Sequence, residues 1–198
     1  MRTLFLAAML GAPLAAAAAT AQIEVETEAG KPLAGAVVFL ESREARAAAK
    51  PAQGVEIAQV ARQFSPQVTV VPIGTSVQFP NRDTVRHHVY SFSPTKNFEL
   101  KLYAGKDANP VLFDKPGIAV LGCNIHDNMA AWVVVVETPY YGQSGANGRA
   151  TLDNVPAGNY RLRVWHAGLP VGAPAQDLPL ALAATGSMLT VRLPGVKP

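Results

Sequence analysis

This chain of 198 residues has only one cysteine, Cys123. An internal disulfide is therefore excluded, and the thiol must be buried and inert, bonded to another chain, or a ligand. Beyond the N-terminal apolar stretch, no segment long enough to cross a membrane is both free of charged residues and predominantly apolar. Long helical patterns of apolar residues are also few. These absences exclude a disulfide scaffold and disfavour a transmembrane or helical protein.

The N-terminus has the pattern of a cleaved export signal. Arg2 precedes an apolar stretch from Leu4 to Leu14, and the alanine run that follows ends in the small-residue pattern Ala19-Thr20-Ala21. Residues 1–21 are therefore predicted to be a signal peptide. No cysteine stands near the predicted cut and the twin-arginine pattern is absent, so we expect a soluble periplasmic protein without a membrane anchor.

The charge of the chain is small and mixed. The formal net charge is +3, and loss of Arg2 with the signal removes one positive charge and leaves +2. The remaining lysines and arginines are scattered among acidic residues rather than gathered in one run. This distribution argues against nucleic acid as a partner.

The part after the signal has the pattern of an all-β protein. Short β-branched runs are separated by glycine, proline and asparagine turns, and Arg43–Gly54 is expected to be a linker or a short helix. The candidate strands suffice for two small sandwiches: Ile23–Glu26, Ala36–Leu40, Val68–Val71, Ser76–Phe79, His88–Phe92, Phe98–Leu102, Ile118–Leu121, Trp132–Glu137, Ala150–Leu152, Tyr160–Trp165 and Leu189–Leu193.

One loop carries the donors of a metal site. The spacing Cys123-x-x-His126-x-x-Met129 places a thiolate, an imidazole and a thioether at three-residue intervals. One thiolate, two imidazoles and a weak axial thioether form the ligand set of blue-copper centres. The second imidazole must come from upstream, where His87 and His88 are the candidates. Both faces of that strand are partly apolar, so the period-two alternation does not decide between them.

Simpler interpretations explain fewer of these residues. A free cysteine is commonly a small buried hydrophobe, and a methionine is commonly core filler. Zinc accepts thiolate and imidazole ligands but leaves Met129 without a role. A nucleophilic cysteine paired with His126 lacks a third residue to orient the pair, so we do not expect an enzyme.

The middle of the chain, residues 55–137, resembles the plastocyanin and amicyanin family of cupredoxins. The resemblance rests on Phe79-Pro80-Asn81, His87-His88-Val89, Pro116-Gly117 and Cys123-x-x-His126-x-x-Met129. It implies a Greek-key β-sandwich that binds one copper ion per chain, cycling between Cu(I) and Cu(II), with the ligands His87, Cys123, His126 and Met129.

The same resemblance assigns residues around the ligands. His88 stands where the family has an asparagine that ties down the ligand loop by hydrogen bonding, and it is kept as an alternative ligand. Asn81 is expected close to the ligands. Asp127 is next to His126, whose exposed ring edge is where an electron is expected to enter and leave. A carboxylate there is expected to make this surface less apolar and to favour a partner with positive charge.

The flanking segments resemble a second family. Residues 22–54 and 138–198 resemble the two parts of a transthyretin-like, carboxypeptidase-regulatory-like sandwich, in the opening hairpin and in the Pro156-Ala157-Gly158 turn between two strands. We predict that the cupredoxin domain, residues 55–137, is inserted in or joined to this split sandwich. The whole arrangement resembles plastocyanin-like proteins labelled methylamine utilization proteins, a label that specifies no substrate.

These features together predict a periplasmic type 1 (blue) copper protein that carries single electrons between redox partners, such as a c-type cytochrome or a periplasmic dehydrogenase. One alternative is a periplasmic copper carrier or storage protein, for which metal exchange would be easy. The other is a carbohydrate-binding or adhesion module with a structural metal, whose ligand binding would survive Cys123→Ser.

Overall fold

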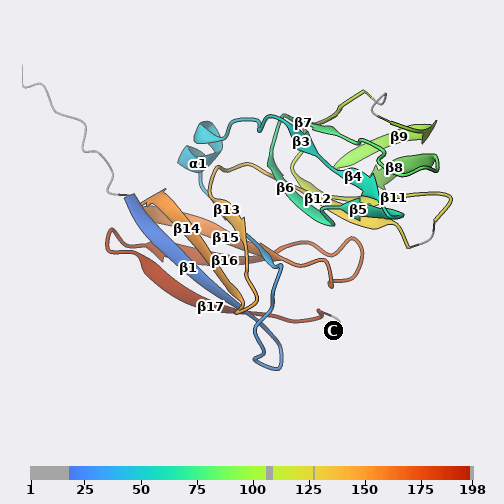
Figure 1. Ribbon diagram of the computed structural model, residues 1–198. Coiled ribbons are helices and arrows are strands. Elements are labelled where there is room, and N and C mark those ends of the chain that lie inside the picture. The colour runs from blue at the N-terminus through green and yellow to red at the C-terminus, as the bar shows by residue number, and fades with distance from the viewer. Residues whose placement is uncertain (1–17, 106–108, 127, 197–198) are drawn as a thin grey trace, which may run out of the picture.

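A computed structural model describes residues 18–105, 109–126 and 128–196 (Figure 1). The prediction of an all-β sandwich protein is confirmed. The elements are β1 (Ala18–Thr27), β2 (Val37–Glu41), α1 (Arg43–Ala48), β3 (Val55–Glu56), β4 (Ala58–Val60), β5 (Gln63–Ser65), β6 (Val68–Pro72), β7 (Thr75–Gln78), β8 (His87–Ser93), β9 (Lys96–Tyr103), β10 (Val111–Phe113), β11 (Gly117–Gly122), β12 (Ala130–Val136), β13 (Tyr141–Gln143), β14 (Arg149–Pro156), β15 (Gly158–Trp165), β16 (Gln176–Leu182) and β17 (Ser187–Leu193). Within the described ranges, no helix is long and apolar enough to cross a membrane.

The strands form two groups, each built around its own core (Figure 1). In the flanking sandwich, the sheet β14-β1-β17 faces the sheet β13-β2-β15-β16. In the central sandwich, the sheet β10-β7-β3 faces β6-β12-β11-β8-β9, and β4 and β5 form a separate hairpin. Whether the central strands can fold alone, as the predicted domain boundaries imply, stays a prediction.

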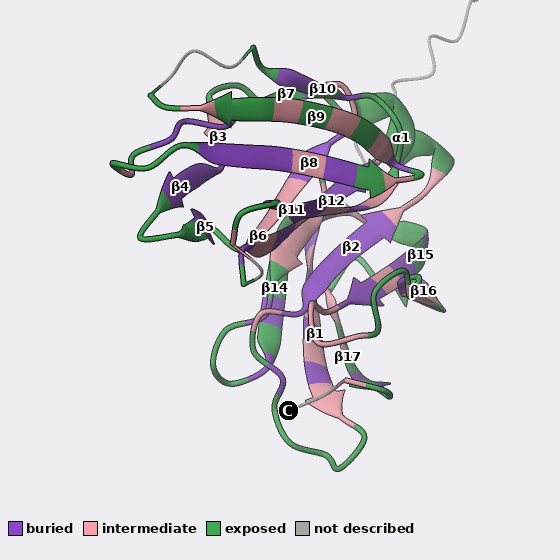
Figure 2. Cartoon of the chain, turned by 90° about the vertical axis from the view of Figure 1, so that its right-hand side faces the viewer, coloured by how far each residue is buried: buried purple, intermediate pink, exposed green. Residues whose placement is uncertain are grey.

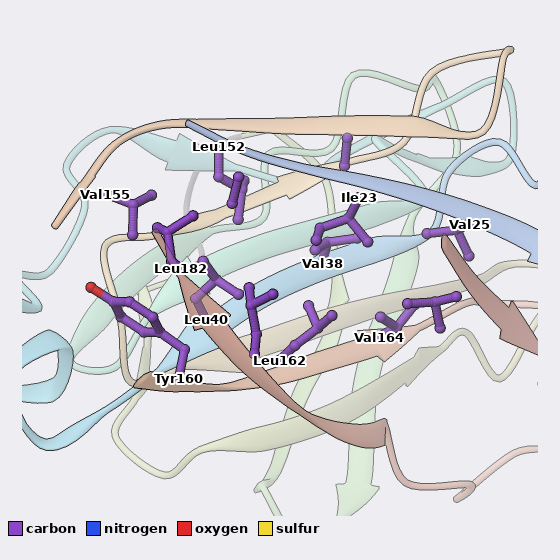
Figure 3. Packing of buried hydrophobic residues seen from close by; sticks show 14 of the residues in the cluster. Ile23, Val25, Val38, Leu40, Leu152, Val155, Tyr160, Leu162, Val164 and Leu182 are labelled. Atoms are coloured by element: carbon purple, nitrogen blue, oxygen red, sulfur yellow. The ribbon is translucent and has the colours of Figure 1, made fainter. Parts of the chain in front are cut away.

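The core of the flanking sandwich begins at the first described residues. Alternate residues of β1 point inward, so Ile23 and Val25 pack against β2 and β15 (Figure 3). Ala19 and Ala21 belong to the same core and are paired with β14. A signal-peptide cut after Ala21 would therefore remove two buried residues from the sheet, and its position stays a prediction to be measured.

Strands β2 and β12 are buried on both faces, and their contact joins the two sandwiches. In β12, Val133 and Val135 point into the central core, while Val134 and Val136 point the other way and pack against Val37 and Phe39 of β2. Burial on both faces explains why the run Ala130–Val136 is apolar throughout rather than alternating. In Figure 2, β2 is coloured as almost wholly buried, and β8 is mostly buried with a half-buried segment and an exposed stretch near its end. Strand β9 alternates between half-buried and exposed.

Sequence patterns located the long strands but not the short ones. The strands β3, β4, β5, β10 and β13 have two or three residues each, too few to show an alternation. Strand β16 was missed for a different reason, because Pro179 interrupts its pattern. It lies at the edge of its sheet, where a residue without an N–H is tolerated. The predicted linker or helix contains α1, whose first turn is capped by Ser42 Oγ accepting from the Ala45 N–H.

Candidate metal centre

Three side chains from two segments of the central sandwich converge on one point. His87 opens β8, and Cys123 follows the last residue of β11. Cys123 Sγ lies 3.9 Å from His87 Nδ1 and 4.0 Å from His126 Nδ1. All three donor atoms lie within 4.8 Å of one another. The first two residues are buried, and His126 is half-buried.

The fourth predicted donor belongs to the same region of the core. Met129 is 2% exposed and packs in the cluster that contains Cys123. Its backbone N–H donates to the carbonyl of His126 at 3.0 Å, which closes the loop before β12 begins. Asp127, between them, lies outside the described residues.

The structure brings His87 to this cluster, whereas His88 faces elsewhere. Because neighbouring residues of a strand point to opposite sides, only one of the two rings can reach the thiol. The His88 ring lies beside Asn124, whose Nδ2 is 2.9 Å from His88 Nδ1, and beside Glu99, whose Oε1 is 2.9 Å from Nε2 without hydrogen-bond alignment. His88 thus holds the loop that carries Cys123 through its contact with Asn124. This is the role that the family's asparagine has at the same position.

Asp83 holds the His87 ring from behind. His87 Nε2 lies 2.8 Å from Asp83 Oδ2, so with its hydrogen on Nε2 the ring presents a free Nδ1 to Cys123. The carboxylate also accepts the backbone N–H groups of Ala61 and Arg62, at 2.6 and 2.9 Å, from a turn with φ of 51° and 57°. Burial opposes ionisation of Asp83, but the hydrogen bonds from Arg62, His87 and Ala61 together lower its pKa.

Asn81 fixes the loop that leads to His87. Its Nδ2 donates to the carbonyls of Val85 and Tyr103, and its Oδ1 accepts the N–H of Asp83. Asn81 therefore acts on the backbone before β8. Nearby, burial raises the pKa of Tyr103 to about 12, against the opposing effect of a hydrogen bond from Gln59.

Two residues important for this arrangement were missed in the sequence. Asp83 is four residues before His87, but this spacing lies in a turn, where it does not by itself indicate a contact. Tyr90 lies over Gly122, so that a Cβ at Gly122 would stand 2.6 Å from Tyr90 Cζ. Glycine is thus needed directly before Cys123 because an aromatic ring from the neighbouring strand occupies the space of its side chain.

The donor set matches copper better than other common metals. A thiolate suits Cu(I), imidazole nitrogens bind both oxidation states, and a thioether is a soft ligand. The three clustered donors and the buried Met129 therefore point to copper binding.

The chain was compared with known proteins in three ways. A scan against protein-family models finds no match, and a search of curated proteins finds none. Among solved structures, a copper-containing nitrite reductase from Thermus scotoductus SA-01 is 26% identical over 46% of this chain and 26% of that one, with a TM-score of 0.40. This chain thus spans about a quarter of the reductase.

Two smaller copper proteins are also similar. A purple cupredoxin from Nitrosopumilus maritimus is 23% identical over 41% of this chain and 99% of that one, with a TM-score of 0.37. A mutant of amicyanin in its reduced Cu(I) form is 18% identical over 50% of this chain and 98% of that one, with a TM-score of 0.39. At these scores the likenesses carry no weight for the site, which is interpreted from its own geometry.

Proposed function

We propose that this protein is a periplasmic blue copper protein that carries single electrons between redox partners. The observation that carries the proposal is the convergence of one thiol and two imidazoles, whose donor atoms lie within 4.8 Å of one another. The proposed ligands of a single copper ion are His87, Cys123 and His126, with Met129 as the weak axial ligand.

The surroundings of these residues suit electron transfer. Bound copper would supply the Cu(II)/Cu(I) couple. The protein holds the donors in place: Asp83 fixes the His87 ring, Asn124 and His88 fasten the ligand loop, and strand ends anchor Cys123. Such restraint keeps the geometry similar in both oxidation states.

The proposed electron port is the ring of His126, the one member of the cluster that is not buried. Ile125 beside it is 48% exposed and supplies apolar contact surface. A c-type cytochrome or a periplasmic dehydrogenase is the class of partner that we propose. On this proposal the protein transforms no substrate.

The direct test is to add Cu(II) to the mature protein and to record visible and EPR spectra. Intense thiolate-to-copper charge transfer is expected, and it should be lost in Cys123→Ser and strongly altered in His87→Gln. His166→Gln is the matched control, because this half-buried histidine bonds to Ala34 in the flanking sandwich and should leave the spectrum unchanged. A colourless protein, or a copper signal that Cys123→Ser leaves intact, would refute the proposal.

Rapid metal exchange would instead favour a copper carrier or storage protein. The buried thiol and the hydrogen-bonded loop predict slow exchange. Carbohydrate or adhesion binding that is retained in Cys123→Ser would assign the function to the flanking sandwich, whose resemblance to transthyretin-like domains stays a prediction.

A further inference from the structure

A groove lies where the two sandwiches meet, and we propose that it binds a neutral, planar aromatic small molecule. Its volume is about 890 Å³, within the usual range of roughly 300–1,000 Å³ for small-molecule sites. One wall is the outer face of β8, β11 and β12, and the other is formed by β15 and by residues 170–175. Figure 1 shows the segment after β15 reaching from the flanking sandwich towards the central one.

Aromatic rings from both sandwiches line this groove. Trp132 and Trp165, the only tryptophans of the chain, have ring centroids 6.2 Å apart with an angle of 55° between their planes. The ring centroids of Tyr90 and Phe92 lie 5.0 Å apart on the wall formed by β8. Phe92 is 71% exposed, so it contributes nothing to either core. Such rings offer large, rigid faces for stacking.

The charge of the lining favours an uncharged ligand. Among the described residues that line the groove, Arg163 is the only charged one. Its Nε donates to Asp177 at 2.7 Å, Glu41 lies 3.7 Å from its Nη1, and its guanidinium stands over the Phe39 ring. Arg161 shares both carboxylates, so two arginines and two carboxylates balance one another. An anionic ligand therefore gains little from Arg163 and would lose its hydration.

The shape of the groove favours a small molecule over a protein surface. The site is a hollow between two walls rather than a flat face, and the segment 170–175 carries prolines at both Pro170 and Pro174, which limit its freedom. Cys123 and Met129 are among the residues that line the groove. A redox-active aromatic compound bound here would therefore lie beside the proposed copper ligands, although the binding itself does not depend on copper.

The test uses the full mature chain, labelled with ¹⁵N and without added metal, so that its outcome is separate from that of the copper experiment. The chain gives two indole N–H signals, which Trp132→Phe and Trp165→Phe assign. Titration with 2-naphthol should shift both signals in a saturable way. Its charged counterpart, 2-naphthalenesulfonate, should bind more weakly.

Matched variants locate the site. Phe92→Glu places a charge on the wall of the groove and should weaken 2-naphthol binding about tenfold, as expected for loss of one aromatic contact and its apolar surroundings. Leu102→Glu makes the same kind of change at an exposed residue of the neighbouring strand β9, outside the groove, and should leave the affinity unchanged.

Several outcomes would overturn the proposal. These are the absence of a saturable shift, equal weakening by both variants, and binding of the sulfonate as tight as that of 2-naphthol. Indole shifts that follow protein concentration rather than 2-naphthol would show that a second copy of the chain occupies the groove.

Discussion

Replacing Asp83 by asparagine tests how this carboxylate would tune the reduction potential of the proposed copper site. The carboxylate lies 2.8 Å from His87 Nε2 and its pKa is lowered, so it carries a negative charge at neutral pH. A negative charge near the metal stabilises Cu(II) relative to Cu(I). Across the imidazole, at about 7 Å and an effective dielectric constant of about 20, the interaction is about 2.4 kcal/mol, on the order of 100 mV for one electron.

The side chain of Asp83 is 13% exposed, so solvent will reduce this effect. We expect Asp83→Asn to raise the reduction potential by about 50–100 mV, measured by protein-film voltammetry or redox titration. Asparagine keeps the size and one acceptor oxygen, so the visible spectrum should persist. Asp153→Asn, the same exchange at an exposed residue of the flanking sandwich, is the control. It should shift the potential by less than about 10 mV, because solvent and salt screen an exposed charge. An unchanged or lower potential in Asp83→Asn, with the blue band intact, would refute this reasoning.

Four further predictions concern stability and domain structure. Gly122→Ala should destabilise the fold by about 1–3 kcal/mol, because its methyl group would collide with Tyr90. Chemical denaturation should show that Gly122→Ala lowers the free energy of unfolding less in a Tyr90→Ala background than in the wild type. Asp177→Asn should cost less than about 1 kcal/mol at neutral pH, since its partners in β15 are partly exposed. The arginines in β15 lower the pKa of Asp177 despite opposing burial, so its contribution is present above the usual Asp pKa of about 3.9 and is lost as pH falls below it. Denaturation at several pH values should therefore show the wild type and the variant converging in acid. Residues 55–137 expressed alone should fold but self-associate in size-exclusion chromatography, because the outer face of β12 loses its cover. Mass spectrometry of the exported protein should find a mature N-terminus upstream of the predicted cut after Ala21, since β1 already uses residues 18–21.

The sequence alone located the donor residues of the site but not their supports. Cys123, His126 and Met129 follow from spacing within one loop, which local geometry preserves. Strand alternation did not choose between His87 and His88, since both faces of β8 are partly buried. The family resemblance favoured His87, and the structure places its ring, not that of His88, beside Cys123. Asp83 contacts the His87 ring from the turn before β8, and no periodic pattern in the sequence predicts that contact.

The fold was predictable to a similar extent. Long strands with apolar side chains, such as β15, show their pattern directly. Strand β16 does not, because Pro179 lowers its strand propensity and only the position at a sheet edge makes the proline acceptable. The contact between the two sandwiches could not be predicted from the sequence either. An unbroken apolar run such as β12 indicates burial on both faces but does not identify the second neighbour.

The double burial of β12 also bears on how long the site would keep a metal. Its odd-numbered residues belong to one core and its even-numbered residues contact the other sandwich, so the strand cannot detach locally without opening both. The loop that ends at Met129 runs directly into this strand. Release of a metal that requires this loop to open widely should then be as slow as unfolding of the molecule as a whole, and the residence time of the ion would be a property of the entire chain rather than of its ligands.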